Sequence, residues 1–130
     1  TVMIGMRGTS YNNSDFEYGW EKGVTILPIE ECFERGWPAI LQQAREIVGE
    51  RETYVSFDID FIDPTYAPGT GTPEVGGPTS FEAISCVRRL HGLNIIGADL
   101  VEVSPPFDVG GTTAWLGASV MFELICAMLD

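Results

Sequence analysis

Positive charge is scarce in this sequence of 130 residues. Seven Lys and Arg residues stand against nineteen Asp and Glu residues, which gives a formal net charge of −12. Because the resulting field repels phosphate backbones and anionic lipids, we expect neither a nucleic-acid partner nor a membrane partner. No apolar run long enough to span a membrane occurs, and the first residues do not resemble a secretory signal, so we expect a cytoplasmic protein.

Histidine and paired cysteines are also scarce. The only histidine, His91, lies in Arg88–Gly92 at the end of an expected helix, where capping of the helix explains it without chemistry. Cys32, Cys86 and Cys126 are widely spaced and include no Cys-x-x-Cys pair. This pattern favours reduced thiols in a core over a disulfide framework or a zinc site.

Short apolar runs alternate with stretches of helical periodicity along the chain. We expect strands at residues 2–6, 24–27, 53–59 and 93–103, and helices at 29–35, 38–48, 80–90 and 112–129. We expect a loop with a helical turn at 11–20, and irregular structure at 64–78, which holds four prolines and four glycines. Thr79 or Ser80 should cap the helix that follows. The alternation predicts one α/β domain with a parallel sheet covered on both faces.

Carboxylates stand where two of the expected strands end. Asp58 and Asp60 are two residues apart at the end of one strand, and Glu102 is near the end of the last. In an extended strand Asp58 and Asp60 would point to the same face, and ligands of open parallel sheets bind beyond the carboxyl ends of the strands. Oxygen ligands of this kind suit hard cations. Asp63 is close enough to act as a third carboxylate or to support the first two.

Each of these side chains could instead serve a turn or a strand end without binding a metal. Aspartate favours the turns that follow strands. An EF-hand loop beginning at Asp58 is excluded, because Asp63 replaces its sixth-position glycine and Gly69 replaces its twelfth-position glutamate. The glycine-rich segment 67–77 lacks the lysine and the glycine spacing of a phosphate-binding loop. Thr72 could be a turn residue, and Glu102 could be an exposed residue at a strand end.

Two longer segments resemble the signature of one enzyme family. Ser56–Pro64 (SFDIDFIDP) and Ala67–Gly77 (APGTGTPEVGG) are similar to the C-terminal signature of the arginase/agmatinase ureohydrolase family. The likeness extends from Ile4–Gly8 to Gly97–Pro106 and the last expected helix. It is closer to agmatinases, guanidinobutyrases and guanidinopropionases than to arginases, in which the Pro-Gly-Thr-Gly-Thr-Pro run usually differs. The resemblance implies the three-layer α/β/α arginase-like ureohydrolase fold with a mainly parallel sheet.

The resemblance also implies a binuclear manganese (Mn2+) site, in which two ions share a hydroxide that attacks a guanidinium carbon. By this resemblance Asp58 bridges the two ions and Asp60 ligates one of them. Glu102 would accept hydrogen bonds from the guanidinium group, and Thr72 would lie near the substrate. The implied reaction is hydrolysis of a small, cationic, linear guanidino compound to urea and an amine. Agmatine, 4-guanidinobutanoate and 3-guanidinopropanoate all stay open as substrates.

Part of the family pattern is absent from these residues. The family's other metal ligands lie in Gly-Asp-His and Asp-Ala-His-x-Asp segments, neither of which occurs here. We therefore expect those ligands upstream of Thr1, and expect residues 1–130 to be the C-terminal part of a single ureohydrolase domain, inactive alone. The family likeness implies a homo-oligomer, either a trimer or a hexamer. The rival hypotheses are a noncatalytic fragment or assembly module of this fold and a magnesium-dependent phosphohydrolase, which the lack of basic phosphate clamps disfavours.

Overall fold

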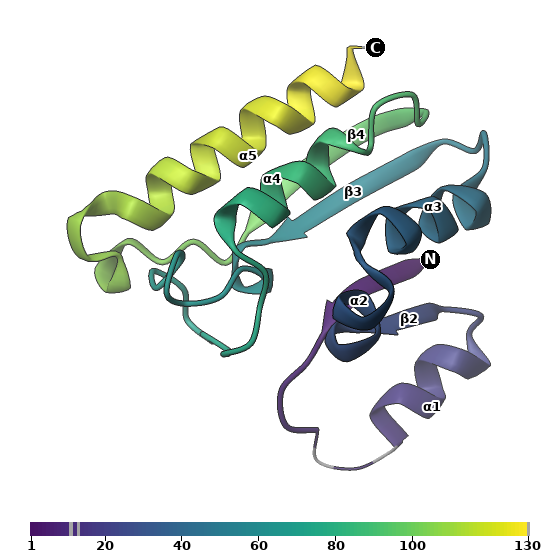
Figure 1. The fold of residues 1–130 in the computed structure, drawn as a ribbon, viewed down its shortest axis with the longest axis horizontal. Helices are drawn as coiled ribbons and strands as arrows, with labels where there is room; N and C mark the ends of the chain where they lie inside the picture. The colour runs from purple at the N-terminus through teal and green to yellow at the C-terminus, as the bar shows by residue number, and fades with distance from the viewer. Residues whose placement is uncertain (11, 13, 130) are drawn as a thin grey trace.

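The computed structural model describes residues 1–10, 12 and 14–129 (Figure 1). Strands and helices alternate along these residues, as the sequence predicts. The strands are β1 Val2–Met6, β2 Thr25–Pro28, β3 Thr53–Asp58 and β4 Ile95–Val101, and the α-helices are α1 Ser14–Glu21, α2 Ile29–Arg35, α3 Trp37–Val48, α4 Ser80–Arg88 and α5 Thr112–Met128. The 3-10 helices are η1 Ile59–Phe61, η2 Pro105–Phe107 and η3 Val109–Gly111.

The strands form two parallel pairs within the described residues. β1 pairs with β2 and β3 pairs with β4, in a register that places Asp58 beside Val101. Both pairings are parallel, as expected, so the carboxyl ends of β3 and β4 lie at the same edge. The sequence led us to expect a single sheet. In the part of the chain that the structure describes, no hydrogen-bonded ladder joins the two pairs (Figure 1).

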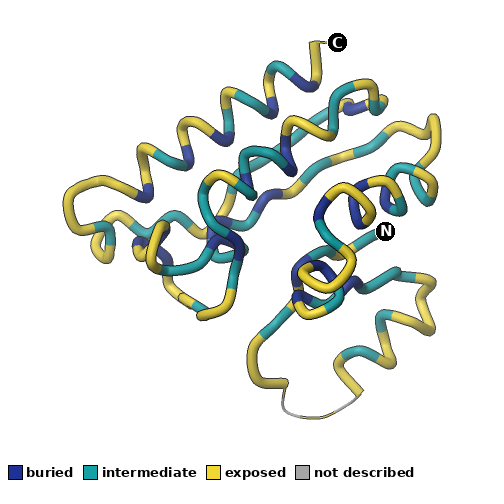
Figure 2. The backbone as a smooth tube through the Cα atoms, in the orientation of Figure 1, coloured by how far each residue is buried: buried dark blue, intermediate teal, exposed yellow. Residues whose placement is uncertain are grey.

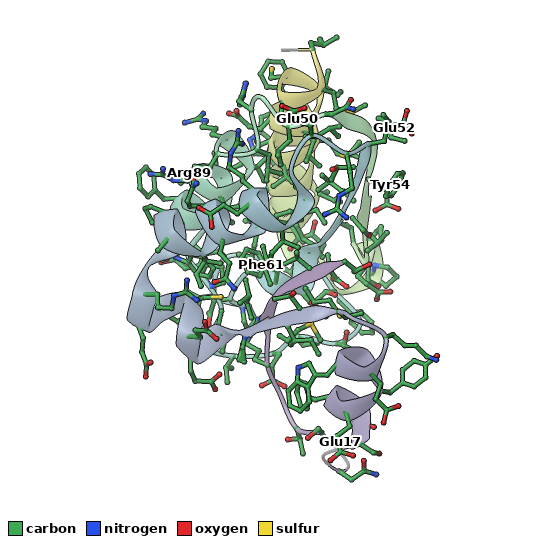
Figure 3. All side chains as sticks on the ribbon, turned by 90° about the vertical axis from the view of Figure 1, so that its right-hand side faces the viewer. Glu17, Glu50, Glu52, Tyr54, Phe61 and Arg89 are labelled. Carbon is green, nitrogen blue, oxygen red and sulfur yellow. The ribbon has the colours of Figure 1, made fainter. Side chains whose placement is uncertain are left out.

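Helices cover one face of the β3–β4 pair. α4 and α5 pack against the face that carries Val55 and Phe57 from β3 and Ala98 and Leu100 from β4. The opposite face carries Tyr54, which is 59% exposed and projects outward from the strands (Figure 3). The predicted cover on both faces is therefore not found for this pair among the described residues.

Helices lie on both sides of β2 in the other pair. Leu27 is buried in a core formed with α2 and α3, whereas the neighbouring Ile26 packs against Gly19 of α1. Successive side chains of a strand point to opposite faces, so α1 and the α2–α3 unit cover opposite faces of β2. The β1–β2 pair therefore has the layered arrangement that the sequence predicts.

Tyr54 lies across Gly97 on the open face of β3–β4. A Cβ atom at Gly97 would be 2.9 Å from Cε2 of the tyrosine ring, which is closer than real side chains approach. The hydroxyl group of Tyr54 donates a hydrogen bond to Oδ2 of Asp99 at 3.0 Å, and this bond raises the pKa of Tyr54. Glycine at position 97 thus leaves room for the aromatic ring.

Phe61 connects the two hydrophobic cores (Figure 3). Its ring makes edge-to-face contacts with Phe57 of the β3–β4 core, at 5.7 Å between centroids, and with Trp37 of the β1–β2 core, at 5.6 Å. Gly5 allows this approach, since a Cβ there would be 2.5 Å from the Phe61 ring, and its φ of 79° also favours glycine. The end of β3 is therefore packed against both halves of the molecule.

Residues 11–20 contain more helix than the sequence predicts. α1 begins at Ser14, whose N–H group donates to Oδ1 of Asn12 at 2.8 Å, and the rings of Phe16 and Trp20 stack one turn apart. No α1 residue is buried, as Figure 2 shows, and the helix is only eight residues long, so its periodicity is a weak signal in the sequence. Residues 11 and 13 of the expected loop lie outside the described residues.

α5 is apolar on most of its surface. By length and composition alone, residues 109–128 could cross a membrane, with a mean hydropathy of 1.3 and 22% of the window buried. Core helices of soluble proteins pass the same test. Val120 and Leu124 of α5 are buried in the core that this helix forms with α4 and β4. Glu123 of α5 forms an ion pair with Arg88. This is weak evidence for a membrane span, and the expected lack of a membrane partner stays a prediction.

Candidate active site

The turn after β3 brings Asp58 and Asp60 together. Asp58 is the last residue of the strand, and Asp60 lies in η1. Oδ1 of Asp58 accepts a hydrogen bond from the N–H group of Asp60 at 3.0 Å. Ile59 between them is fully buried. The expectation that an extended strand carries both carboxylates is thus wrong in detail, because the strand ends at Asp58 and a 3-10 turn places Asp60.

Three carboxyl groups influence one another at this edge of the sheet. Burial raises the pKa of Asp58 to about 6, and the N–H group of Asp60 opposes that shift. The negative charges of Asp60 and Glu102 contribute to the same rise, of which burial is the largest cause. All three carboxylates therefore lie within electrostatic range, and a bound cation would relieve their repulsion.

Glu102 follows β4 in an unusual backbone conformation. Its φ is 66°, and among the described residues it is the one non-glycine residue with a positive φ. Left-handed backbone costs a glutamate about 1 kcal/mol or more, and such strain is typical of functional sites. The side chain stands next to the glycine-rich segment, since a Cβ at Gly71 would be 3.9 Å from Oε2 of Glu102. The structure thus holds Glu102 beside the carboxylates of the β3 turn.

Thr72 and Asp63 have different roles in the loop 64–78. The Thr72 hydroxyl donates to Oδ2 of Asp60 at 3.1 Å, so Thr72 lies within the site. Asp63 accepts the N–H groups of Thr65 and Gly76, each at 2.9 Å. A hydrogen bond from the Thr65 side chain, together with these N–H groups, lowers the pKa of Asp63. Because both of its oxygens bind the loop backbone, Asp63 stabilises the loop, and a role as a third carboxylate or as a support for the first two stays a prediction.

Arg7 is the residue near the site to which the sequence alone assigned no role. Its guanidinium group donates to the carbonyl oxygens of Asp60 at 2.7 Å, Glu74 at 2.6 Å and Val75 at 3.1 Å. The residues joined are 53 to 68 positions apart in the sequence. Backbone acceptors carry no sequence signal, so spacing arguments could not find this contact.

The donor set fits part of a metal site. Carboxylate oxygens suit manganese and other hard divalent cations, and mutual repulsion makes Asp58 and Asp60 receptive to one. Among the described residues, however, no group of three or more His, Cys, Asp and Glu side chains is arranged to hold a metal ion. α4 ends at Arg88 with Arg89 as its C-cap, so His91, where capping was expected, lies two residues beyond the cap. The two aspartates would therefore supply only a share of the ligands that a binuclear site needs.

Comparison with known proteins supports the resemblance. The model of the arginase family matches residues 1–127. The chain belongs to the arginase family. It is 54% identical to guanidinopropionase of Pseudomonas aeruginosa, over 100% of this chain and 41% of that protein, and 46% identical to the mitochondrial agmatinase of Gallus gallus, over 98% and 37%.

Solved structures of the arginase family share the fold. Proclavaminate amidino hydrolase from Streptomyces clavuligerus superposes with a TM-score of 0.92 at 39% identity, over 98% of this chain and 42% of that one. Arginase from Bacillus caldovelox gives 0.86 at 32% identity, over 95% and 42%. The predicted family and its α/β fold are thus confirmed, and the chain spans about two fifths of the length of these relatives.

Proposed function

We propose that this chain supplies part of the active site of a manganese-dependent ureohydrolase. The observation that carries the proposal is the convergence of Asp58, Asp60 and Glu102 at the carboxyl ends of β3 and β4, with Thr72 bonded to Asp60. Ligands of parallel sheets bind at that edge. The names of the relatives, which include guanidinopropionase, agmatinase and guanidinobutyrase, favour a guanidino substrate.

In this proposal Asp58 and Asp60 hold manganese through their carboxylate oxygens. Bound manganese would supply a hydroxide nucleophile at neutral pH, because divalent ions lower the pKa of water. With its raised pKa of about 6, Asp58 is largely ionised at neutral pH and available as a ligand. The hydroxyl group of Thr72 holds the Asp60 carboxylate in place.

Glu102 would bind the substrate. A guanidinium group is planar and cationic, and a carboxylate can accept two parallel hydrogen bonds from it. Placed beside Gly71, where no side chain fills the space, Glu102 can orient the guanidinium carbon toward the metal-binding aspartates. The reaction would release urea and leave an amine, and agmatine, 4-guanidinobutanoate and 3-guanidinopropanoate are the candidate substrates.

A noncatalytic role is the second candidate for residues 1–130 taken alone. The observation that favours it is the absence, among the described residues, of any group of three or more metal-ligating side chains. A chain that holds two carboxylates without further ligands would complete a site only together with other parts of the protein.

The test is urea release by the full-length protein. Purified protein is stripped with a chelator, reloaded with manganese or magnesium, and assayed with each of the three guanidino compounds. We expect urea from at least one compound, only after reloading with manganese. Release of inorganic phosphate from phosphate esters, or no urea from any compound, would contradict the proposal.

A further inference from the structure

Arg7 extends from the end of β1 to the turn and loop that form the candidate site. It belongs to the β1–β2 half of the molecule, and its half-buried side chain ends among backbone carbonyls of the other half. Nη2 donates both to the carbonyl of Asp60, in η1, and to that of Glu74, while Nε donates to Val75. One guanidinium group thus bonds two separate segments of the site.

These two segments carry the site's side chains. The η1 segment carries the Asp60 carboxylate, and the segment that includes Glu74 and Val75 begins with Thr72. The Thr72 hydroxyl bonds to Oδ2 of Asp60, so the two segments are joined once by side chains and once through Arg7. A planar group with five donors can make these three bonds, whereas a lysine ammonium cannot match their geometry.

Glycines leave space for the arginine. A Cβ at Gly77 would be 2.7 Å from Nη2 of Arg7 and 2.5 Å from the carbonyl oxygen of Phe61. A Cβ at Gly8 would be 2.9 Å from Oε2 of Glu74. A side chain at position 77 would displace Arg7 or the backbone at Phe61 and Asp63, so glycine there leaves room for this contact. At position 8 the flexible Glu74 side chain could move aside, and it is the φ of 92° that favours glycine.

We propose that Arg7 is a positioning residue for the metal-binding turn. The inference rests on the proposed function. By fixing the backbone of Asp60 against the 72–75 segment, Arg7 sets the direction in which the Asp60 carboxylate points. Without it, three carbonyl groups lose a charged donor, and the hydrogen bonds that still fix Asp60 are those with Asp58 and Thr72, beside the core packing of Ile59 and Phe61.

The experiment compares Arg7→Gln with Arg45→Gln in the full-length protein. Arg45 is a matched control, because its guanidinium group also donates to two backbone carbonyls, those of Arg89 at 3.0 Å and His91 at 2.9 Å, at the far end of α4. Three quantities are measured: manganese affinity from the electron paramagnetic resonance signal of free ions, the melting temperature, and hydrogen exchange of the metal-free protein.

We expect Arg7→Gln to weaken manganese binding by about tenfold or more, as removal of groups that orient metal ligands does. Hydrogen exchange at residues 59–62 and 72–77 should be faster before any metal is added. Arg45→Gln should lower the melting temperature and leave manganese affinity unchanged. Arg7→Lys, which keeps the charge, should lose an intermediate amount of affinity.

Manganese affinity in Arg7→Gln equal to that of Arg45→Gln would overturn the inference. If Arg7→Gln does not fold, the test uses Arg7→Lys instead. A manganese affinity equal to that of wild type in Arg7→Lys would then refute the positioning role. A wild-type protein that binds no manganese would defeat the proposed function and this inference together. Normal binding by wild type with unaffected Arg7 variants would defeat the inference alone.

Discussion

Asp60 is held on three sides at the scale of single residues. Its N–H group bonds to Asp58, its carbonyl oxygen accepts from Arg7, and its carboxylate accepts from Thr72. The carboxylate of Asp58 is disfavoured by burial and by neighbouring negative charge. The surroundings therefore disfavour the charged form of Asp58, whereas three hydrogen bonds fix the orientation of Asp60.

Substituting either aspartate should separate metal binding from folding. We expect Asp58→Asn and Asp60→Asn in the full-length protein to contain less manganese and to release no urea, because each loses an anionic ligand. The metal-free Asp58→Asn variant should melt no lower than wild type, since the substitution relieves repulsion by Asp60 and Glu102. Metal analysis, urea assays and calorimetry test this. Unchanged manganese content and activity in both variants would refute the assignment.

Glu102→Gln should reduce turnover without removing the metal. A neutral amide still hydrogen-bonds a guanidinium group but no longer balances its charge. The loss should be about 2 kcal/mol, or roughly thirtyfold in kcat/KM. Steady-state urea assays and metal analysis of the same preparation measure both effects. If manganese were lost along with activity, Glu102 would belong to the metal site.

Sequence reasoning found these side chains and missed what orients them. The sequence named Asp58, Asp60, Glu102 and Thr72 as candidates from spacing, strand ends and family resemblance, and the structure brings them together, while their roles stay predictions. The turn at Asp60 and the left-handed backbone of Glu102 were not predictable, because both depend on tertiary contacts. The contacts of Arg7 were invisible for the same reason.

At the scale of elements, strong local signals gave accurate boundaries. α2 runs from Ile29 to Arg35 and ends at Gly36, as expected, and Thr79 caps α4. The last two expected strands came out shorter at their carboxyl ends, at Asp58 and Val101, because turns that carry site residues begin there. The pattern of apolar residues predicts where each strand lies, but it does not predict the turn that ends the strand.

The capping box of α4 gives a prediction at this scale. Thr79 and Glu82 bond reciprocally, and the indole N–H of Trp37 also donates to Glu82 at 3.2 Å. Thr79→Ala should destabilise the protein by about 1 kcal/mol. The hydrogen bonds from Thr79 lower the pKa of Glu82 below its ordinary value of 4.5. Its contribution is therefore present above pH 4.5 and is lost as the pH falls through the lowered folded-state value.

Calorimetry of wild type and Glu82→Ala at neutral pH and near pH 4 measures this dependence. The difference in melting temperature should shrink at the lower pH. A difference that stays constant would show that the Glu82 side chain contributes through packing and not through its charge.

At the scale of the whole molecule, the family and fold were predictable from the sequence, but the way in which the two strand pairs are connected was not. The parallel pairing and helix alternation follow from the sequence pattern, but nothing local shows that the described strands form two pairs connected through Phe61 and Arg7. The expectations of a trimer or hexamer and of a cytoplasmic location stay predictions.

Residues 1–130 expressed alone should neither bind two manganese ions tightly nor release urea. Asp58 and Asp60 supply too few ligands, and water would fill most of each coordination shell. The open face of β3–β4 and exposed side chains such as Trp115, 80% exposed, should also promote aggregation. Manganese titration, urea assays and light scattering, beside the full-length protein, test this. Tight binding of two ions and turnover by residues 1–130 would show that the ligands are misplaced.

The Tyr54 ring that lies across Gly97 has a consequence for how this family varies over time. Position 97 cannot gain a side chain while position 54 is aromatic, because a methyl group at 97 would meet the ring at 2.9 Å, whereas Tyr54 can shrink while position 97 stays glycine. Lineages that keep an aromatic residue at 54 should therefore keep glycine at 97, and a larger residue at 97 should appear only where 54 has become small. An alignment of homologues should record the pair as covarying, even though neither residue touches the candidate site.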